Sequence, residues 1–134
     1  MISMAARPVI FALANPVPEI GYSQAREIRP DAVVATGRSD IPNQINNVLA
    51  FPYLFRGALD TLSTTINEEM KLAAAHAIAA IAKEETPREI EESHGRRLVF
   101  GKEYLLPTPG DRRLAERVPA AVAMAAMKSG VARR

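Results

Sequence analysis

The sequence has no cysteine. This absence excludes disulfide bonds and zinc sites built on thiolates, and it fits a reducing compartment. No apolar run approaches the roughly 18 residues that a membrane-spanning helix needs. Residues 1–7 also lack the long apolar stretch of a secretory signal. We therefore expect a soluble, cytoplasmic protein with no membrane partner.

An excess of charge of one sign is also missing, because 17 basic residues are nearly balanced by 15 acidic ones and the formal net charge is +2. Aromatic residues make up only 5% of the chain, and none alternate with basic residues as they do on single-strand nucleic-acid surfaces. We expect no nucleic-acid partner. The apolar content of 48% is typical of a folded globular chain, and 134 residues suit one ordinary domain.

Several motifs that carry chemistry are absent. The sequence has no P-loop, no Gly-x-Gly-x-x-Gly turn and no Ser-His-Asp spacing. His76 and His94 have no partner at a spacing typical of metal ligands. The acidic pairs at 68–69 and 91–92 are better explained as helix-end and surface charges than as an acid/base pair. The residues alone therefore indicate no catalytic or metal-binding group.

Two continuous apolar runs, residues 9–14 and 32–36, are typical of strands buried on both faces of a parallel sheet. Between them, Tyr22–Ile28 has the composition of a short crossover helix, with Ser23 as its cap. Strand, helix and strand form a βαβ unit. The sequence therefore predicts an α/β fold.

Helical patterns dominate the rest of the chain. Pro52 is expected to interrupt one helix, Thr65 and Glu68 form a capping box, and Asp111 and Pro119 each begin a helix. The expected helices cover residues 43–50, 54–62, about 65–83, 86–93, 112–116 and 119–129.

Amide side chains follow both apolar runs. Asn15 comes directly after the first, and Asn46 and Asn47 follow the second, on the first turn of the expected helix. Ligands bind beyond the carboxyl ends of parallel strands, amides offer both donors and acceptors, and a helix N-terminus attracts anions. These three residues are therefore candidates for one ligand cleft. The simpler alternatives are a turn at Asn15-Pro16 and helix-start roles for Asn46 and Asn47.

Long ordered motifs cover residues 11–16, 18–19, 35–52, 55–60 and 66–74, with a looser match over 98–101, 104–107 and 120–132. These motifs resemble those of bacterial malic enzymes. The resemblance covers nearly the whole chain, and it implies the distal half of a Rossmann-like NAD(P)-binding domain followed by C-terminal helices. Residues 1–134 are thus expected to be a partial domain, and Tyr53 looks like the long bacterial form, which adds a phosphotransacetylase-like domain.

This resemblance implies oxidative decarboxylation of (S)-malate to pyruvate and carbon dioxide, with reduction of NADP or NAD and a requirement for Mg or Mn. In similar enzymes the asparagine matching Asn15 lies near the nicotinamide and is cofactor-binding. The residue matching Asn47 contacts the substrate carboxylate, and Asn46 lies beside it. The resemblance therefore assigns Asn47 and Asn46 to substrate binding.

Departures from the family pattern limit these expectations. The general-acid tyrosine, the general-base lysine, the acidic metal ligands and the glycine-rich turn of similar enzymes belong to segments before Met1. Thr108 and Gly110 stand where the family has lysine and phenylalanine. We expect an enzyme fragment with no catalytic or metal residue of its own, inactive and unstable alone, which forms a homo-oligomer or pairs with the complementing N-terminal half. The alternatives are a non-catalytic α/β interaction or assembly module and a small α/β binding protein.

Overall fold

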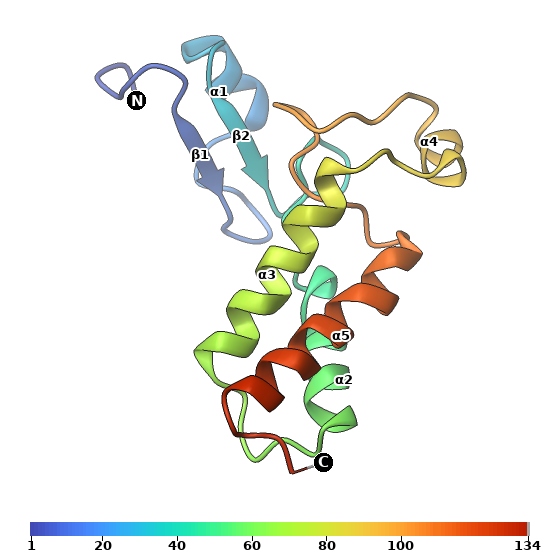
Figure 1. Cartoon of the computed structure of the whole chain (residues 1–134). Coiled ribbons are helices and arrows are strands. Elements are labelled where there is room, and N and C mark those ends of the chain that lie inside the picture. Colours follow the sequence, from blue (N-terminus) through green and yellow to red (C-terminus); the bar gives the residue numbers. More distant parts are fainter. Residues whose placement is uncertain (134) are drawn as a thin grey trace. The chain divides into compact units, whose positions relative to one another are not determined.

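The computed structural model describes residues 1–133, and the chain divides into two compact units. The first unit contains residues 1–46 together with 100–106. The second contains residues 47–99 and the chain from Pro107 onward. Figure 1 labels the strands and α-helices of both units, numbered in chain order.

The first unit is a βαβ element made of β1 (Val9–Ala12), α1 (Tyr22–Ile28) and β2 (Val33–Thr36). The two strands pair in parallel, from Val9 opposite Val33 to Ala12 opposite Thr36. The predicted βαβ unit and the α/β class are confirmed. Both strands are shorter than the apolar runs that predicted them.

Small side chains form the core of the first unit. Ala25 of α1 packs on Ala32 and Val34, and all three are at most 1% exposed. The prediction of burial on both faces is wrong for β1, because Val9 and Phe11 are 57% and 53% exposed. Strand β1 therefore presents two apolar side chains to solvent.

The N-terminal segment is held against the first unit by the Arg29 guanidinium. Arg29 forms an ion pair of 2.9 Å with Asp31, and Asp31 accepts the N–H of Arg7 at 2.7 Å. Hydrogen bonds from Arg29 and then from the Arg7 N–H lower the pKa of Asp31 far below its usual range. The Arg29 guanidinium also donates to carbonyl oxygens of the N-terminal segment, those of Met1, Met4 and Ala5.

Asp31→Asn is expected to release residues 1–7 at neutral pH, because it removes the negative charge that orients Arg29. A lowered pKa makes the contribution of Asp31 to stability complete above the unfolded value of about 3.9, and the contribution is lost as the pH falls below that value. At pH 7 the Arg7 amide, whose N–H is accepted by Asp31, should thus exchange faster in Asp31→Asn than in the parent. Equally slow exchange of the Arg7 amide in the variant at pH 7 would show that Asp31 does not hold the N-terminal segment.

The second unit consists of η1 (Asn47–Leu49), α2 (Phe51–Asp60), α3 (Glu68–Lys83), α4 (Arg88–His94) and α5 (Arg112–Lys128). Figure 1 shows α2, α3 and α5 in one bundle, and α5 packs extensively against both of the others. Four α5 side chains, spaced four residues apart, are fully buried because they line one face of the helix. They are Leu114, Val118, Val122 and Ala126.

Several expected helix boundaries are wrong. Residues 43–50 are not an α-helix, since only the short 3₁₀ turn η1 forms there. Pro52 does not interrupt a helix, because it lies in the first turn of α2, where no backbone N–H bond is needed. Pro119 does not begin a helix but lies inside the continuous α5, whose buried face holds the helix together.

The cap predictions had mixed outcomes. Asp111 caps α5 as expected, by accepting the N–H of Arg113 at 3.0 Å. Ser23 does not cap α1, because the helix begins one residue earlier, after Gly21. Thr65 does not cap α3, because Asn67 does so by accepting the Met70 N–H at 3.1 Å. The predicted end of α3 at Lys83 is confirmed.

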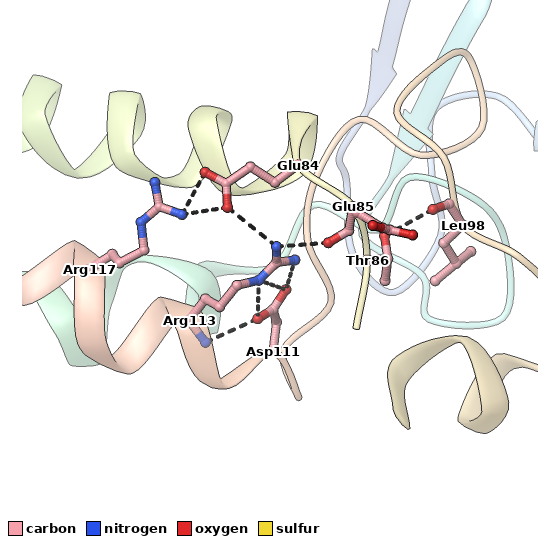
Figure 2. A network of polar contacts seen from close by, with 7 residues as sticks. All are labelled: Glu84, Glu85, Thr86, Leu98, Asp111, Arg113 and Arg117. Carbon is pink, nitrogen blue, oxygen red and sulfur yellow. Dashed lines mark hydrogen bonds and ion pairs between the residues drawn. The ribbon is translucent and has the colours of Figure 1, made fainter. Parts of the chain in front are cut away.

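A polar network ties the start of α5 to the chain that leaves α3 (Figure 2). The side chain of Asp111 is fully buried and lies 2.7 Å from the guanidinium of Arg113. The same guanidinium donates to the carbonyl oxygen of Glu85 at 3.0 Å. Arg117 and Glu84 add a more exposed ion pair at 2.7 Å. Arg113 thus has two roles. It neutralises the buried charge of Asp111, and it holds the backbone after α3 through the Glu85 carbonyl.

None of the helices formed by residues 1–133 is both long and apolar enough to cross a bilayer.

Candidate functional site

Asn15 lies in the turn that follows β1, three residues beyond the strand. Its side chain is exposed, and its peptide bond to Pro16 is cis. The turn is closed by the Glu19 carboxylate, which accepts the N–H of Ala14 at 3.1 Å. Hydrogen bonds from the backbone N–H groups of Glu19 and Ala14 lower the pKa of Glu19, so this carboxylate is charged at neutral pH. The Asn15 side chain is therefore exposed to solvent beyond the carboxyl end of β1.

The loop from Gly37 to Asn46 follows β2 at the same edge of the sheet, because the two strands are parallel. The Thr36 hydroxyl accepts the N–H of Arg38 at 3.1 Å, and the Thr36 carbonyl accepts that of Ile45 at 2.8 Å. Both ends of the loop are thus hydrogen-bonded to the last residue of β2.

An exposed ion pair lies within this loop. The Arg38 guanidinium donates two hydrogen bonds to Asp40, at 2.8 and 2.7 Å. These bonds lower the pKa of Asp40 and raise that of Arg38. A surface pair of this kind adds little to stability. Its two opposite charges largely cancel, so the loop carries little net charge.

Asn46 and Asn47 stand where the first unit gives way to the second. Asn46 is partly buried, whereas Asn47 is exposed and begins η1 with its carbonyl accepting the Ala50 N–H at 3.1 Å. Neither residue is in the first turn of an α-helix, so the expected helical setting of both is wrong. Asn15 and Asn46 share the first unit. The convergence of all three amides on one cleft stays a prediction.

Sequence reasoning missed the role of Asn43, which was expected in a helix. This residue is buried inside the loop with a left-handed φ of 58°. No motif marks it, because its hydrogen-bond partners are distant in the sequence.

Metal-binding chemistry finds no support among residues 1–133, where no group of three or more His, Asp or Glu side chains is placed to hold an ion. The His94 ring nitrogen Nδ1 lies 2.9 Å from the carbonyl of Ile90, one helical turn earlier. His94 therefore makes a local contact at the end of α4.

Comparison with known proteins connects these features to one family. The family model described as "Malic enzyme, NAD binding domain" matches residues 1–92. The chain is 57% identical over 133 residues to an NADP-dependent malic enzyme of Rhizobium meliloti, covering 98% of the chain and 18% of that protein. It is 57% identical over 132 residues to that of Halomonas elongata, covering 98% and 31%. An NAD-dependent malic enzyme of Rhizobium meliloti also shares 57% over 132 residues, covering 98% and 17%.

Solved structures agree with this similarity. A malic enzyme from Pyrococcus horikoshii matches 98% of the chain with a TM-score of 0.81 and 44% identity, over 27% of its own length. The malic enzyme of Entamoeba histolytica matches 98% with the same TM-score and 38% identity, over 24% of its length. The chain spans between 17% and 31% of the curated relatives compared above.

Proposed function

The chain belongs to the malic enzyme NAD-binding domain family, and from this membership we propose that it is part of an enzyme that oxidatively decarboxylates (S)-malate. The products are pyruvate and carbon dioxide, with NADP or NAD reduced. The observation that carries the proposal is the family match over residues 1–92, which includes both loops beyond the carboxyl ends of β1 and β2.

The proposed roles follow from the chemistry of amide side chains. Asn15 holds the nicotinamide end of the cofactor, since an amide can both donate to and accept from a carboxamide. Asn47 donates to a carboxylate of malate, with Asn46 beside it. A bound dinucleotide would accept the hydride from C2 of malate while a base takes the hydroxyl proton. The resulting ketone then loses carbon dioxide as an enolate, and an acid protonates this enolate to give pyruvate. These amides bind and orient the reactants, while the acid and the base come from outside this chain.

Mg or Mn is part of the proposal for the complete enzyme, where a bound divalent ion would supply positive charge to polarise the ketone. In the proposal its ligands belong to other segments of the complete enzyme, as in similar malic enzymes. We propose a cytoplasmic enzyme that is a homo-oligomer or pairs with a complementing N-terminal half. The isolated chain is then inactive.

Asn47→Ala is expected to lower kcat/KM for malate by roughly ten- to a hundredfold, the value of a hydrogen bond to a charged group. The assay places this chain in the Halomonas elongata enzyme in place of its matching segment and follows malate-dependent reduction of NADP and NAD with Mn. Asn15→Ala should instead raise KM for the dinucleotide.

Asn67→Ala is the matched control, because this asparagine caps α3 and has no proposed role in binding. It should lower thermal stability and leave the KM values for malate and for the dinucleotide unchanged. An active transplant in which Asn47→Ala retains full kcat/KM for malate would refute the substrate role. Malate turnover by the isolated 134-residue chain at the rate of the complete enzyme would refute its dependence on other segments.

A second candidate is an interaction or assembly module without catalysis. The exposed apolar face of α2 favours it, with stacked rings of Phe51 and Phe55 at 6.0 Å and with Leu59 at 69% exposure. Exposed apolar clusters of this kind mark contact surfaces. A stable dimer in sedimentation with no binding of NADP or NAD would favour this function over the enzymatic one.

A further inference from the structure

Asn43 anchors the loop of Gly37–Asn46 through every polar atom of its side chain. Its amide nitrogen donates to the carbonyl of Val34 at 2.9 Å and to that of Lys102 at 2.7 Å. Its amide oxygen accepts the N–H of Leu105 at 2.9 Å. One buried side chain therefore joins the loop to β2 and to the segment 100–106.

Two independent requirements select asparagine at this position. The φ of 58° lies in the left-handed region, which glycine and asparagine tolerate better than other residues. The three hydrogen bonds require two N–H donors and one acceptor, which only a side-chain amide provides. Glycine meets the first requirement alone. Aspartate keeps an acceptor but would direct a carboxylate oxygen at two carbonyl oxygens.

The anchor acts on the segment that leads to the proposed substrate-binding residues. Asn43 is fixed by its side chain, and two residues later Ile45 donates its N–H to the Thr36 carbonyl at 2.8 Å. The chain is therefore held on both sides of Gln44, immediately before Asn46. A loop without regular secondary structure owes its order to such contacts.

We propose that Asn43 is a positioning residue, which sets the path of the loop so that Asn46 and Asn47 meet the substrate carboxylate. This inference rests on the proposed function. It predicts that the loss of the amide disturbs malate binding more than dinucleotide binding, because Asn15 is on the other loop.

The anchor itself is tested in the full 134-residue chain by hydrogen exchange. Asn43→Gly retains the backbone freedom but loses the amide, so the N–H groups of Leu105 and Ile45 should exchange faster. Asn67→Gly, which removes an asparagine with two side-chain bonds of its own, should leave those amides unchanged. Unchanged exchange at Leu105 and Ile45 in Asn43→Gly would overturn the proposal.

The functional consequence is tested in the transplanted Halomonas elongata enzyme. Asn43→Gly and Asn43→Asp should each lower kcat/KM for malate at least tenfold, since misplacement by about 1 Å costs up to about a hundredfold. KM for NADP should stay near the parent value. Asn67→Gly should lose thermal stability without this change, which separates positioning from a general loss of folding.

Full activity of Asn43→Asp would overturn the inference, because its carboxylate lacks the donors. Equal kinetic losses in Asn43→Gly and Asn67→Gly would also overturn it. An inactive unsubstituted transplant would count against the proposed function instead, and the exchange measurement would then still decide whether Asn43 fixes the loop.

Discussion

Replacing Arg113 with methionine is expected to lower the free energy of unfolding of the second unit by about 3–5 kcal/mol, because it leaves the charge of a buried carboxylate uncompensated. The side chain of Asp111 is 0% exposed, and its guanidinium partner lies 2.7 Å away. Methionine keeps most of the apolar stem of arginine and removes the charge. The change also frees the carbonyl of Glu85. Urea unfolding followed by circular dichroism measures the loss.

Arg117→Met is the matched control in the same network (Figure 2). Its ion pair with Glu84 has similar geometry, at 2.7 Å, but both side chains are well exposed, at 39% and 46%. Exposed pairs contribute about 0–1 kcal/mol. Equal losses in the Arg113 and Arg117 variants would show that burial of Asp111 is not what makes this network important.

Gly57→Leu is expected to cost about 3 kcal/mol or more, at the upper end of the range for inserting methylenes into a packed core. A Cβ at Gly57 would lie 2.6 Å from the carbonyl oxygen of Pro119 and 2.7 Å from Cβ of Val122. Both atoms belong to or adjoin the α5 backbone, so they cannot move aside as the end of a long side chain can. Helices α2 and α5 would have to separate.

Gly57→Ala tests the same contact with a single carbon. Alanine favours helix by about 1 kcal/mol over glycine, so a helix limited only by propensity would gain stability. The collision predicts a loss instead. Gly37→Ala is the control, because a Cβ there meets nothing within 4 Å, and its effect should stay within about 0.5 kcal/mol. A higher melting temperature for Gly57→Ala would contradict the close approach of α2 to α5.

The features that were predictable from sequence are local ones. The βαβ unit follows from two apolar runs and a short polar segment between them. The Asp111 cap and the end of α3 at Lys83 follow from residues within one turn of the helix end. The position of Asn15 after β1 was also predictable, because it depends only on where the strand ends in the local sequence.

Features that depend on distant contacts were missed. Asn43 was assigned to a helix because its neighbours suit one, but its side chain bonds to Lys102 and Leu105, 59 and 62 residues away. Pro119 is tolerated inside α5 because Val118 and Val122 beside it are fully buried. Gly57 carries no sequence signal, since its importance lies in the helix that packs on it. Such positions require the tertiary structure.

The central position of α5 in its bundle affects the order in which the helices can pack during synthesis on the ribosome. Helices α2 and α3 contact each other little, and each packs mainly on α5, which is synthesised after both of them. The second unit therefore cannot finish folding until Ala126 has left the ribosome. Until then, the apolar faces of α2 and α3 stay exposed to solvent. The ordering of the loop after β2 is delayed as well, because the Asn43 side chain can form its hydrogen bond with Leu105 only after that residue has been synthesised.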